Sequence, residues 1–197
     1  MKQDSHSTRV PMKHLATVAL MLNLGVAGAH AQERPVNMRF SGTGGASAIN
    51  LKQPDTNTVE ENVAGNGTLG PFTFRDVRAI ATSPEPSSAC SGLFFPSMAG
   101  AGVLRFRDGS LLNVNLTEGG DCIDLVHMVG HCTLTFQVNA GTGRFKNAFG
   151  VLTYTETALP VLADAFNSPV LFTETGNFMG TISGVVMEEE QRQDERR

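Results

Sequence analysis

The stretch between residues 118 and 132 holds the densest set of side chains that can bind metals or act as nucleophiles. These side chains are Asp121, Cys122, Asp124, His127, His131 and Cys132. The two histidines lie four residues apart, so one helical turn could direct both at a metal ion, with an aspartate as the third ligand. The Met-Val-Gly between them is a poor helix, however, and along a strand the histidines would lie about 13 Å apart. We therefore predict no metal site, but polar residues near the mouth of a binding site.

Other catalytic patterns are missing from the sequence. It contains no G-x-S-x-G elbow of a serine hydrolase, and the glycine-rich run at residues 42–45 is not followed by the lysine and hydroxyl residue of a phosphate-binding loop. A free cysteine paired with a histidine would need nearby positive charge to lower the pKa of its thiol, and this stretch is acidic. We predict no cofactor and can assign no catalytic residue.

The three cysteines are Cys90, Cys122 and Cys132. In an oxidising compartment two of them are expected to pair. The apolar alternation around Cys132 turns it inward as a small buried residue. We therefore predict a Cys90–Cys122 disulfide, worth roughly 3–4 kcal/mol by the chain-entropy argument. Zinc is the alternative, but C-x9-C without C-x2-C is a weak spacing for it.

The N-terminus has the features of a secretory signal peptide. Residues 15–29 are apolar, follow Lys13, and lead into Ala29-His30-Ala31. A basic start, a short apolar stretch and small residues at the cut are what signal peptidase requires, so we predict cleavage before Gln32. The apolar run is too short to span a bilayer. Translation could also begin at Met12.

The remaining chain, residues 32–197, is predicted to be secreted to the periplasm or the extracellular medium and to form one domain. Residues 1–31 contain three basic residues and one acidic residue, so the formal charge of −4 becomes −6 after cleavage. This charge argues against a nucleic-acid partner. No second apolar run could span a membrane, and residues 188–197 form a charged, flexible tail. The oligomeric state stays open.

After residue 32, short runs rich in Val, Thr, Phe and Leu are separated by Gly, Asn, Asp and Pro, which indicates an all-β domain. Asp108-Gly109 predicts a two-residue type I′ hairpin turn, in which both residues have positive φ. The eight predicted strands are about 36–43, 62–69, 72–80, 101–107, 110–117, 131–139, 150–157 and 176–187.

The predicted connections differ in length in a regular way. The first, third, fifth and seventh are long, at residues 44–61, 81–100, 118–130 and 158–175, whereas the others are short. In an antiparallel meander all the long connections gather at one end. Closing the meander into a barrel removes its exposed edges, and an eight-stranded interior holds side chains or one small ligand. We predict a barrel with its mouth at the end with the long connections.

Residues 141–150 read Gly-Thr-Gly-Arg-Phe-Lys-Asn-Ala-Phe-Gly. They resemble the GTG-[RK]-F-x-x-A-x-G segment of dirigent proteins and allene oxide cyclase-like barrels, with a looser similarity of strand order over residues 100–187. The resemblance implies a calycin-like, eight-stranded antiparallel barrel with an apolar cavity. It transfers no catalytic role, because the polar cavity residues of those families lie on other strands. In the segment itself, Gly141 and Gly143 would allow a tight, left-handed connection, and Phe145 and Ala148 would plug the closed end.

These observations predict a secreted barrel that binds a small apolar ligand, with Phe106, His127, Phe136 and Tyr154 as candidate ligand-binding residues. One alternative is an isomerase- or cyclase-type enzyme, which would need a buried ionisable group. The strand-proximal acids for that role are Asp76, Glu156 and Glu174. The other alternative is a structural or interaction protein of the envelope or extracellular matrix, with a filled barrel. A cavity of roughly a few hundred Å³ with inward polar groups would favour a ligand or catalysis.

Overall fold

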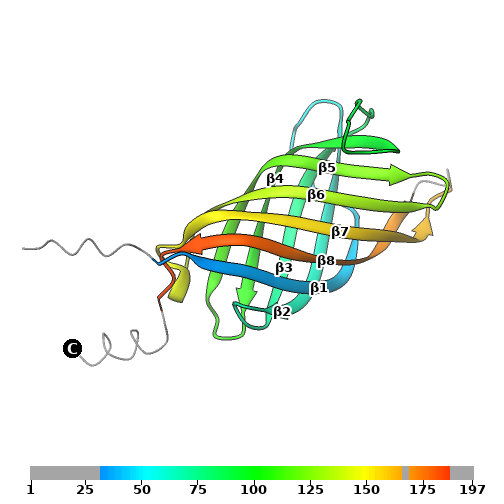
Figure 1. The fold of residues 1–197 in the computed structure, drawn as a ribbon. Helices are drawn as coiled ribbons and strands as arrows, with labels where there is room; N and C mark the ends of the chain where they lie inside the picture. Colours follow the sequence, from blue (N-terminus) through cyan, green and yellow to red (C-terminus); the bar gives the residue numbers. More distant parts are fainter. Residues whose placement is uncertain (1–31, 166–168, 187–197) are drawn as a thin grey trace, which may run out of the picture. The chain divides into compact units, whose positions relative to one another are not determined.

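The computed structural model describes residues 32–165 and 169–186. The predicted leader (1–31) and charged tail (188–197) lie outside these residues. Each strand pairs antiparallel with the next, and the last pairs with the first, which closes a barrel (Figure 1). The elements are β1 (Arg34–Ala46), β2 (Thr56–Gly67), β3 (Phe72–Ala81), β4 (Leu93–Phe106), β5 (Leu111–Asp124), β6 (Val129–Gly141), the 3-10 helix η1 (Gly143–Phe145), β7 (Phe149–Ala163) and β8 (Pro169–Ser183). The predicted all-β, eight-stranded antiparallel barrel is confirmed. Within the described ranges, no helix has the length and apolar character needed to cross a membrane.

Several strands extend further toward one rim than the sequence predicted. β4 begins at Leu93 and β5 runs to Asp124, so much of the loops predicted at 81–100 and 118–130 is strand. The prediction was wrong there because glycines and charged residues interrupt the apolar alternation, although the backbone ladder continues and pairs Leu93 with Ile123. The connections that follow β1, β3, β5 and β7 share one rim, as antiparallel order requires. We call this the open rim and the opposite end the closed rim.

The β4–β5 turn at the closed rim differs from the predicted type I′ hairpin. Gly109 has a φ of +84°, but Asp108 does not have a positive φ. The Gly109 amide donates to the carbonyl of Phe106 at 3.0 Å, and the Ser110 amide donates to the Asp108 carboxylate at 2.9 Å. This is a type I turn followed by a left-handed glycine. Asp108 stabilises the turn through its side chain instead of adopting a left-handed backbone.

Residues 141–150 plug the closed rim. Phe145 and Ala148 are buried, as predicted. Gly143 has a φ of +57°, whereas Gly141 has no positive φ. Glycine is required at Gly141 for a different reason, because a Cβ there would overlap the carbonyl oxygen of Leu111 on β5.

Arg144 holds this plug in place. Its guanidinium lies 5.0 Å from the ring centre of Phe106 and 4.7 Å from that of Phe145. It also donates to the carbonyl of Leu69 at 2.5 Å and pairs with Asp108 at 3.2 Å. The plug is thereby tied to both tight turns of the closed rim.

Aromatic rings fill the half of the barrel next to the closed rim. The ring of Phe178 lies 5.0 Å from those of Phe74 and Tyr154, edge to face, and Phe40 stacks on Tyr154 at 4.9 Å. Such pairs add stability beyond the area that they bury. Tyr154 is the last ring of this stack along β7, and the next inward residue toward the open rim is Glu156. The interior therefore changes from apolar to charged at Tyr154.

The predicted disulfide is present. Cys90, in the connection between β3 and β4, is bonded to Cys122 on β5, with their Cα atoms 5.5 Å apart. Cys132 is free and buried, as predicted. The bond fixes the β3–β4 connection against the barrel wall near the open rim.

Replacing both Cys90 and Cys122 by serine is expected to lower the free energy of unfolding by about 3–4 kcal/mol, because the bond restricts a loop of the unfolded chain. The two residues are separated by 32 positions in the sequence. Urea unfolding of the double variant and the oxidised wild type measures the loss. Reductant should lower the stability of the wild type to the same level and leave the variant unchanged. A loss below about 1 kcal/mol would contradict the prediction.

Candidate ligand-binding site

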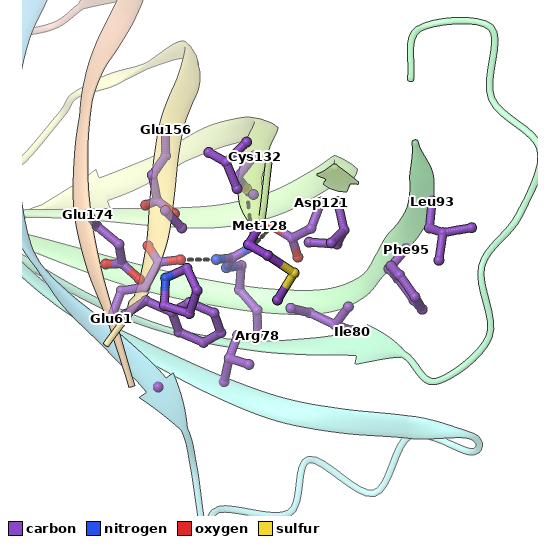
Figure 2. A pocket seen from close by; sticks show the side chains of 18 of the residues that line it. Glu61, Arg78, Ile80, Leu93, Phe95, Asp121, Met128, Cys132, Glu156 and Glu174 are labelled. Carbon is purple, nitrogen blue, oxygen red and sulfur yellow. Dashed lines mark hydrogen bonds and ion pairs between the residues drawn. The ribbon is translucent and has the colours of Figure 1, made fainter. Parts of the chain in front are cut away.

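A cavity of about 340 Å³ lies inside the barrel at the open rim (Figure 2). The part of its wall nearer the open rim is apolar and includes Val59, Ile80, Phe95, Ile123, Met128 and Phe172. Its floor is polar and consists of Glu61, Arg78, Asp121, Cys132, Glu156 and Glu174. An apolar cavity of this size with a few convergent polar groups is typical of a small-molecule site.

Irregular strand register turns several of these residues inward. Val114 on β5 faces the core, but the pairing with β6 shifts between Leu116 and Glu118. One extra residue reverses the alternation of a strand, so Asp121 faces the cavity instead of the solvent. A similar shift between β3 and β4 turns Phe95 inward. The cavity floor and wall therefore depend on bulges as well as on the apolar alternation.

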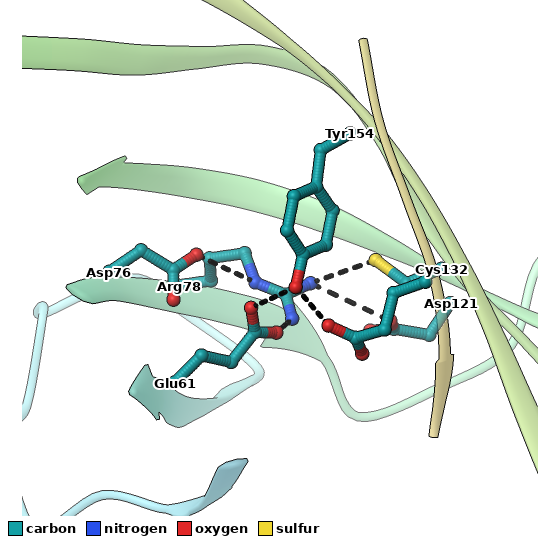
Figure 3. Close-up of polar contacts among 7 residues, drawn as sticks. Glu61, Asp76, Arg78, Asp121, Cys132 and Tyr154 are labelled. Atoms are coloured by element: carbon teal, nitrogen blue, oxygen red, sulfur yellow. Dashed lines mark hydrogen bonds and ion pairs between the residues drawn. The ribbon is translucent and has the colours of Figure 1, made fainter. Parts of the chain in front are cut away.

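Arg78 forms the centre of the cavity floor and is buried (Figure 3). Its guanidinium pairs with Glu61 and lies 3.2 Å from Asp76. It also lies 3.5 Å from Asp121 and donates to the sulfur of Cys132 at 3.3 Å. Burial by itself would lower the pKa of Arg78, but the surrounding acidic groups raise it above its ordinary value. One charged guanidinium thus joins carboxylates from β2, β3 and β5.

The hydroxyl of Tyr154 lies between two carboxyl groups. It donates to Glu61 at 2.6 Å and also contacts Glu156. A hydroxyl donates only one hydrogen bond, so two close carboxyl contacts are most favourable when one of the carboxyls is protonated. Glu61 pairs with Arg78, which favours its ionised form. Glu156 is therefore the partner that more readily takes up a proton.

The pKa values of the floor agree with this assignment. Burial raises the pKa of Glu156 to about 7 against the opposing effect of Arg78. Burial and the nearby Glu156 raise the pKa of Glu174 to about 8. Burial also raises the pKa of Asp76 and of the Tyr154 hydroxyl above their ordinary values. The floor can therefore exchange protons near neutral pH.

Glu174 reaches the same carboxyl groups from β8. One oxygen from each of Glu61, Glu156 and Glu174 lies within 4.8 Å of the other two. Glu174 is only 4% exposed, and its Oε2 has no hydrogen-bond partner among the described residues. Gly44 on the neighbouring strand β1 makes room for it, because a Cβ at that position would overlap the Glu174 carboxyl group. We call Glu61, Glu156 and Glu174 the carboxylate triad.

The four candidate ligand-binding residues lie outside the wall of this cavity. Phe106 packs against the plug of the closed rim, and Phe136 lies in the filled half. His127 is exposed on the β5–β6 turn. Tyr154 comes closest, because its hydroxyl reaches two glutamates of the floor. The alternation of apolar residues identified which side chains point inward, but it does not give their positions along the barrel axis.

The histidine-containing stretch is divided between the two faces of the barrel wall. His127 pairs with Asp124 at 2.7 Å, which raises the pKa of the histidine and lowers that of the aspartate to about 2. His131 is exposed on β6, whereas Asp121 and Cys132 face the cavity. Within residues 32–165 and 169–186, the three side chains that could share a metal ion are the carboxylate triad, without a histidine.

The three acids named from the sequence, Asp76, Glu156 and Glu174, are all buried in or beside the floor. The sequence reasoning missed Glu61 and Arg78, which are equally buried. For Arg78 a signal was present, because Phe72, Phe74, Asp76 and Arg78 alternate along one predicted strand. Glu61 fell one residue before the predicted start of its strand, although it shares the inward face of Val63.

Comparison of the chain with protein-family models and with curated proteins found no match. The geometry of the site is therefore the basis for its interpretation.

Proposed function

We propose that this protein binds a small, largely apolar molecule in the open half of its barrel. The observation that carries the proposal is the cavity of about 340 Å³, which has an apolar wall and an ionisable floor. The apolar surface continues at its mouth, where Leu125 and Met128 line the cavity and are also exposed. An apolar ligand could therefore enter without crossing a charged rim. An unfilled interior speaks for ligand binding rather than a purely structural role.

A location outside the cytoplasm is part of the same proposal. The leader-like residues 1–31 support it, and so does the Cys90–Cys122 bond, since disulfides persist mainly in oxidising compartments. Kinship with dirigent and allene oxide cyclase-like barrels is also proposed, and the ten-residue segment and the eight-stranded meander support it. N-terminal sequencing of the exported protein should give Gln32 as the first residue. An intact leader on the exported protein would contradict this.

Replacing Ala158 by phenylalanine is expected to weaken ligand binding at least about tenfold, because the added ring occupies space inside the cavity. Ala158 lines the cavity from β7. The neutral apolar dye N-phenyl-1-naphthylamine, whose fluorescence rises on transfer from water, measures binding. Thr153→Phe is the matched control, since it adds the same ring on the outer face of the same strand. Equal binding by both variants, or no binding by the wild type, would contradict the proposal.

A second candidate function is catalysis by an isomerase- or cyclase-type barrel. The observation that favours it is the Glu156–Tyr154 contact in the cavity floor. Burial raises the pKa of Glu156 to about 7, which is suitable for a general acid or base at neutral pH. Incubation with neutral apolar olefins and epoxides, followed by chromatography of the isomers, tests this function. Conversion that is lost in Glu156→Gln would support it, and full recovery of every compound would argue against it.

A further inference from the structure

Acidic groups outnumber basic groups in and beside the cavity floor. Five carboxyl groups gather there around one guanidinium, and they belong to Glu61, Asp76, Asp121, Glu156 and Glu174. Arg78 forms its ion pairs with the first three of these residues. Glu174 lies at the edge of this network, buried, with an unpartnered carboxylate oxygen. A buried carboxylate without a partner is costly, so this floor favours a ligand that brings hydrogen-bond donors and positive charge.

The spacing of the carboxylate triad suits a protonated primary amine. An ammonium group has three N–H donors, and three hydrogen bonds of about 2.8 Å place their acceptors about 4.6 Å apart. The three triad oxygens lie within 4.8 Å of one another. Figure 2 shows the carboxyl groups of Glu61, Glu156 and Glu174 turned toward one another at the inner end of the cavity. Each of the three donors would thus find one acceptor.

We propose that the ligand is a small hydrophobic amine whose ammonium group donates to Glu61, Glu156 and Glu174 while its hydrocarbon part fills the apolar mouth. This inference rests on the proposed ligand-binding function and adds the chemical class of the ligand. Phe172 lies two residues from Glu174 on β8 and lines the cavity on the rim side of it. A hydrocarbon chain attached to the bound nitrogen therefore continues along apolar side chains.

A metal ion matches these surroundings less well. Calcium takes six to eight oxygen ligands, and magnesium keeps several water molecules. The triad could supply ligands on one side of a metal ion. On the side toward the open rim, however, the cavity is bounded by apolar side chains such as Ile80 and Phe172. The apolar wall can pack against the hydrocarbon part of an amine, but it offers no ligand atoms to a metal ion.

Protons take the place of the ammonium group when the cavity is empty. Glu156 and Glu174 have pKa values raised to about 7 and about 8, so both are largely protonated at mildly acidic pH. An alkylammonium displaces these protons on binding. Its hydrogen bonds to Glu156 and Glu174 each replace one O–H proton that is released to solvent, whereas Glu61 is already ionised through its pair with Arg78. Affinity is therefore expected to rise between about pH 6 and pH 8.5. The other titratable or charged groups that face the triad are Asp76, Arg78, Asp121, Cys132 and Tyr154.

Three probes that share an alkyl chain and differ in their polar group test the inference. They are octylamine, octanol and octanoate, each titrated calorimetrically into the purified protein. Octylamine should bind at least about tenfold more tightly than octanol, and octanoate more weakly than either. At about pH 6.5, titrations in buffers of different ionisation enthalpy should show proton release with octylamine and none with octanol. Equal binding of octanol and octylamine would overturn the inference that the ligand is an amine, but would leave the proposal of a ligand-binding cavity intact. Failure of all three probes would count against both.

Two variants locate the ammonium group. Glu174→Gln keeps the shape but not the charge, and should weaken octylamine at least about tenfold while leaving octanol unchanged. Gly44→Ala should do the same, because its methyl group displaces the Glu174 carboxyl. Glu60→Gln is the control, since Glu60 pairs with Arg75 outside the cavity. Wild-type binding of octylamine by Glu174→Gln would overturn the inference, as would Glu174-dependent binding of calcium or manganese without octylamine binding.

Discussion

Replacing Arg78 by methionine is expected to lower the free energy of unfolding by about 3–5 kcal/mol at neutral pH, because removing one member of a buried charge network leaves its partners uncompensated. Arg78 is 2% exposed and pairs with Glu61, Asp76 and Asp121. Methionine has a similar length, so most of the loss would come from charge and not from a cavity. Urea unfolding measures the difference. Adding Glu61→Gln should restore part of the lost stability, since it removes one of the unpaired charges.

The same strand provides a matched control for Arg78→Met. Arg75 points outward, its side chain is 66% exposed, and it pairs with Glu60 at 3.0 Å. Arg75→Met should change stability by less than about 0.5 kcal/mol. The effect of Arg78→Met should also shrink at about pH 5, because protons then neutralise the stranded carboxylates. Equal losses from the two substitutions would mean that the charge network contributes nothing to the fold.

The wild-type protein is expected to lose stability as the pH rises from about 5 to about 8. The ordinary pKa of a glutamate is 4.5, and burial raises the pKa of Glu156 to about 7 in the folded state. Between these two values the folded chain holds a proton that the unfolded chain has released. Stability therefore falls with pH by about 1.4 kcal/mol per unit for each such group. Glu174 acts in the same direction, with its pKa raised to about 8.

Glu156→Gln should flatten this profile. Glutamine keeps the contact with Tyr154 but cannot ionise, so the loss between about pH 5 and pH 7 should shrink by roughly 2–3 kcal/mol. Chemical unfolding at several pH values measures the slope. Glu60→Gln, on the outer face of β2, should leave the profile unchanged. A wild type whose stability rises over this interval would show that Glu156 is ionised in the folded protein.

The architecture of this protein could be predicted from its amino-acid sequence. Alternating apolar residues predicted eight strands and an all-β barrel, because one face of every strand must be buried. The sequence also predicted the Cys90–Cys122 pairing, because the apolar alternation turned Cys132 inward and left the other two cysteines to pair. Residues 145 and 148 were predicted to plug the closed rim. These features depend on local pattern and connection order, which a single chain displays directly.

The position and the composition of the candidate site, in contrast, depend on how the strands pair in the folded barrel. Asp121 faces the cavity because of a bulge at residues 116–118, and a register shift has no signature in the alternation. Glu61 and Arg78 come from β2 and β3, and their ion pair exists only because those strands are adjacent. Glu61 fell before the predicted start of its strand and so resembled a loop residue, and the burial of Arg78 was missed although it alternates with Phe74 and Asp76. Burial is a property of the closed barrel, and it is burial that raises the pKa of Glu156 and Glu174 and makes the floor of the cavity chemically distinct.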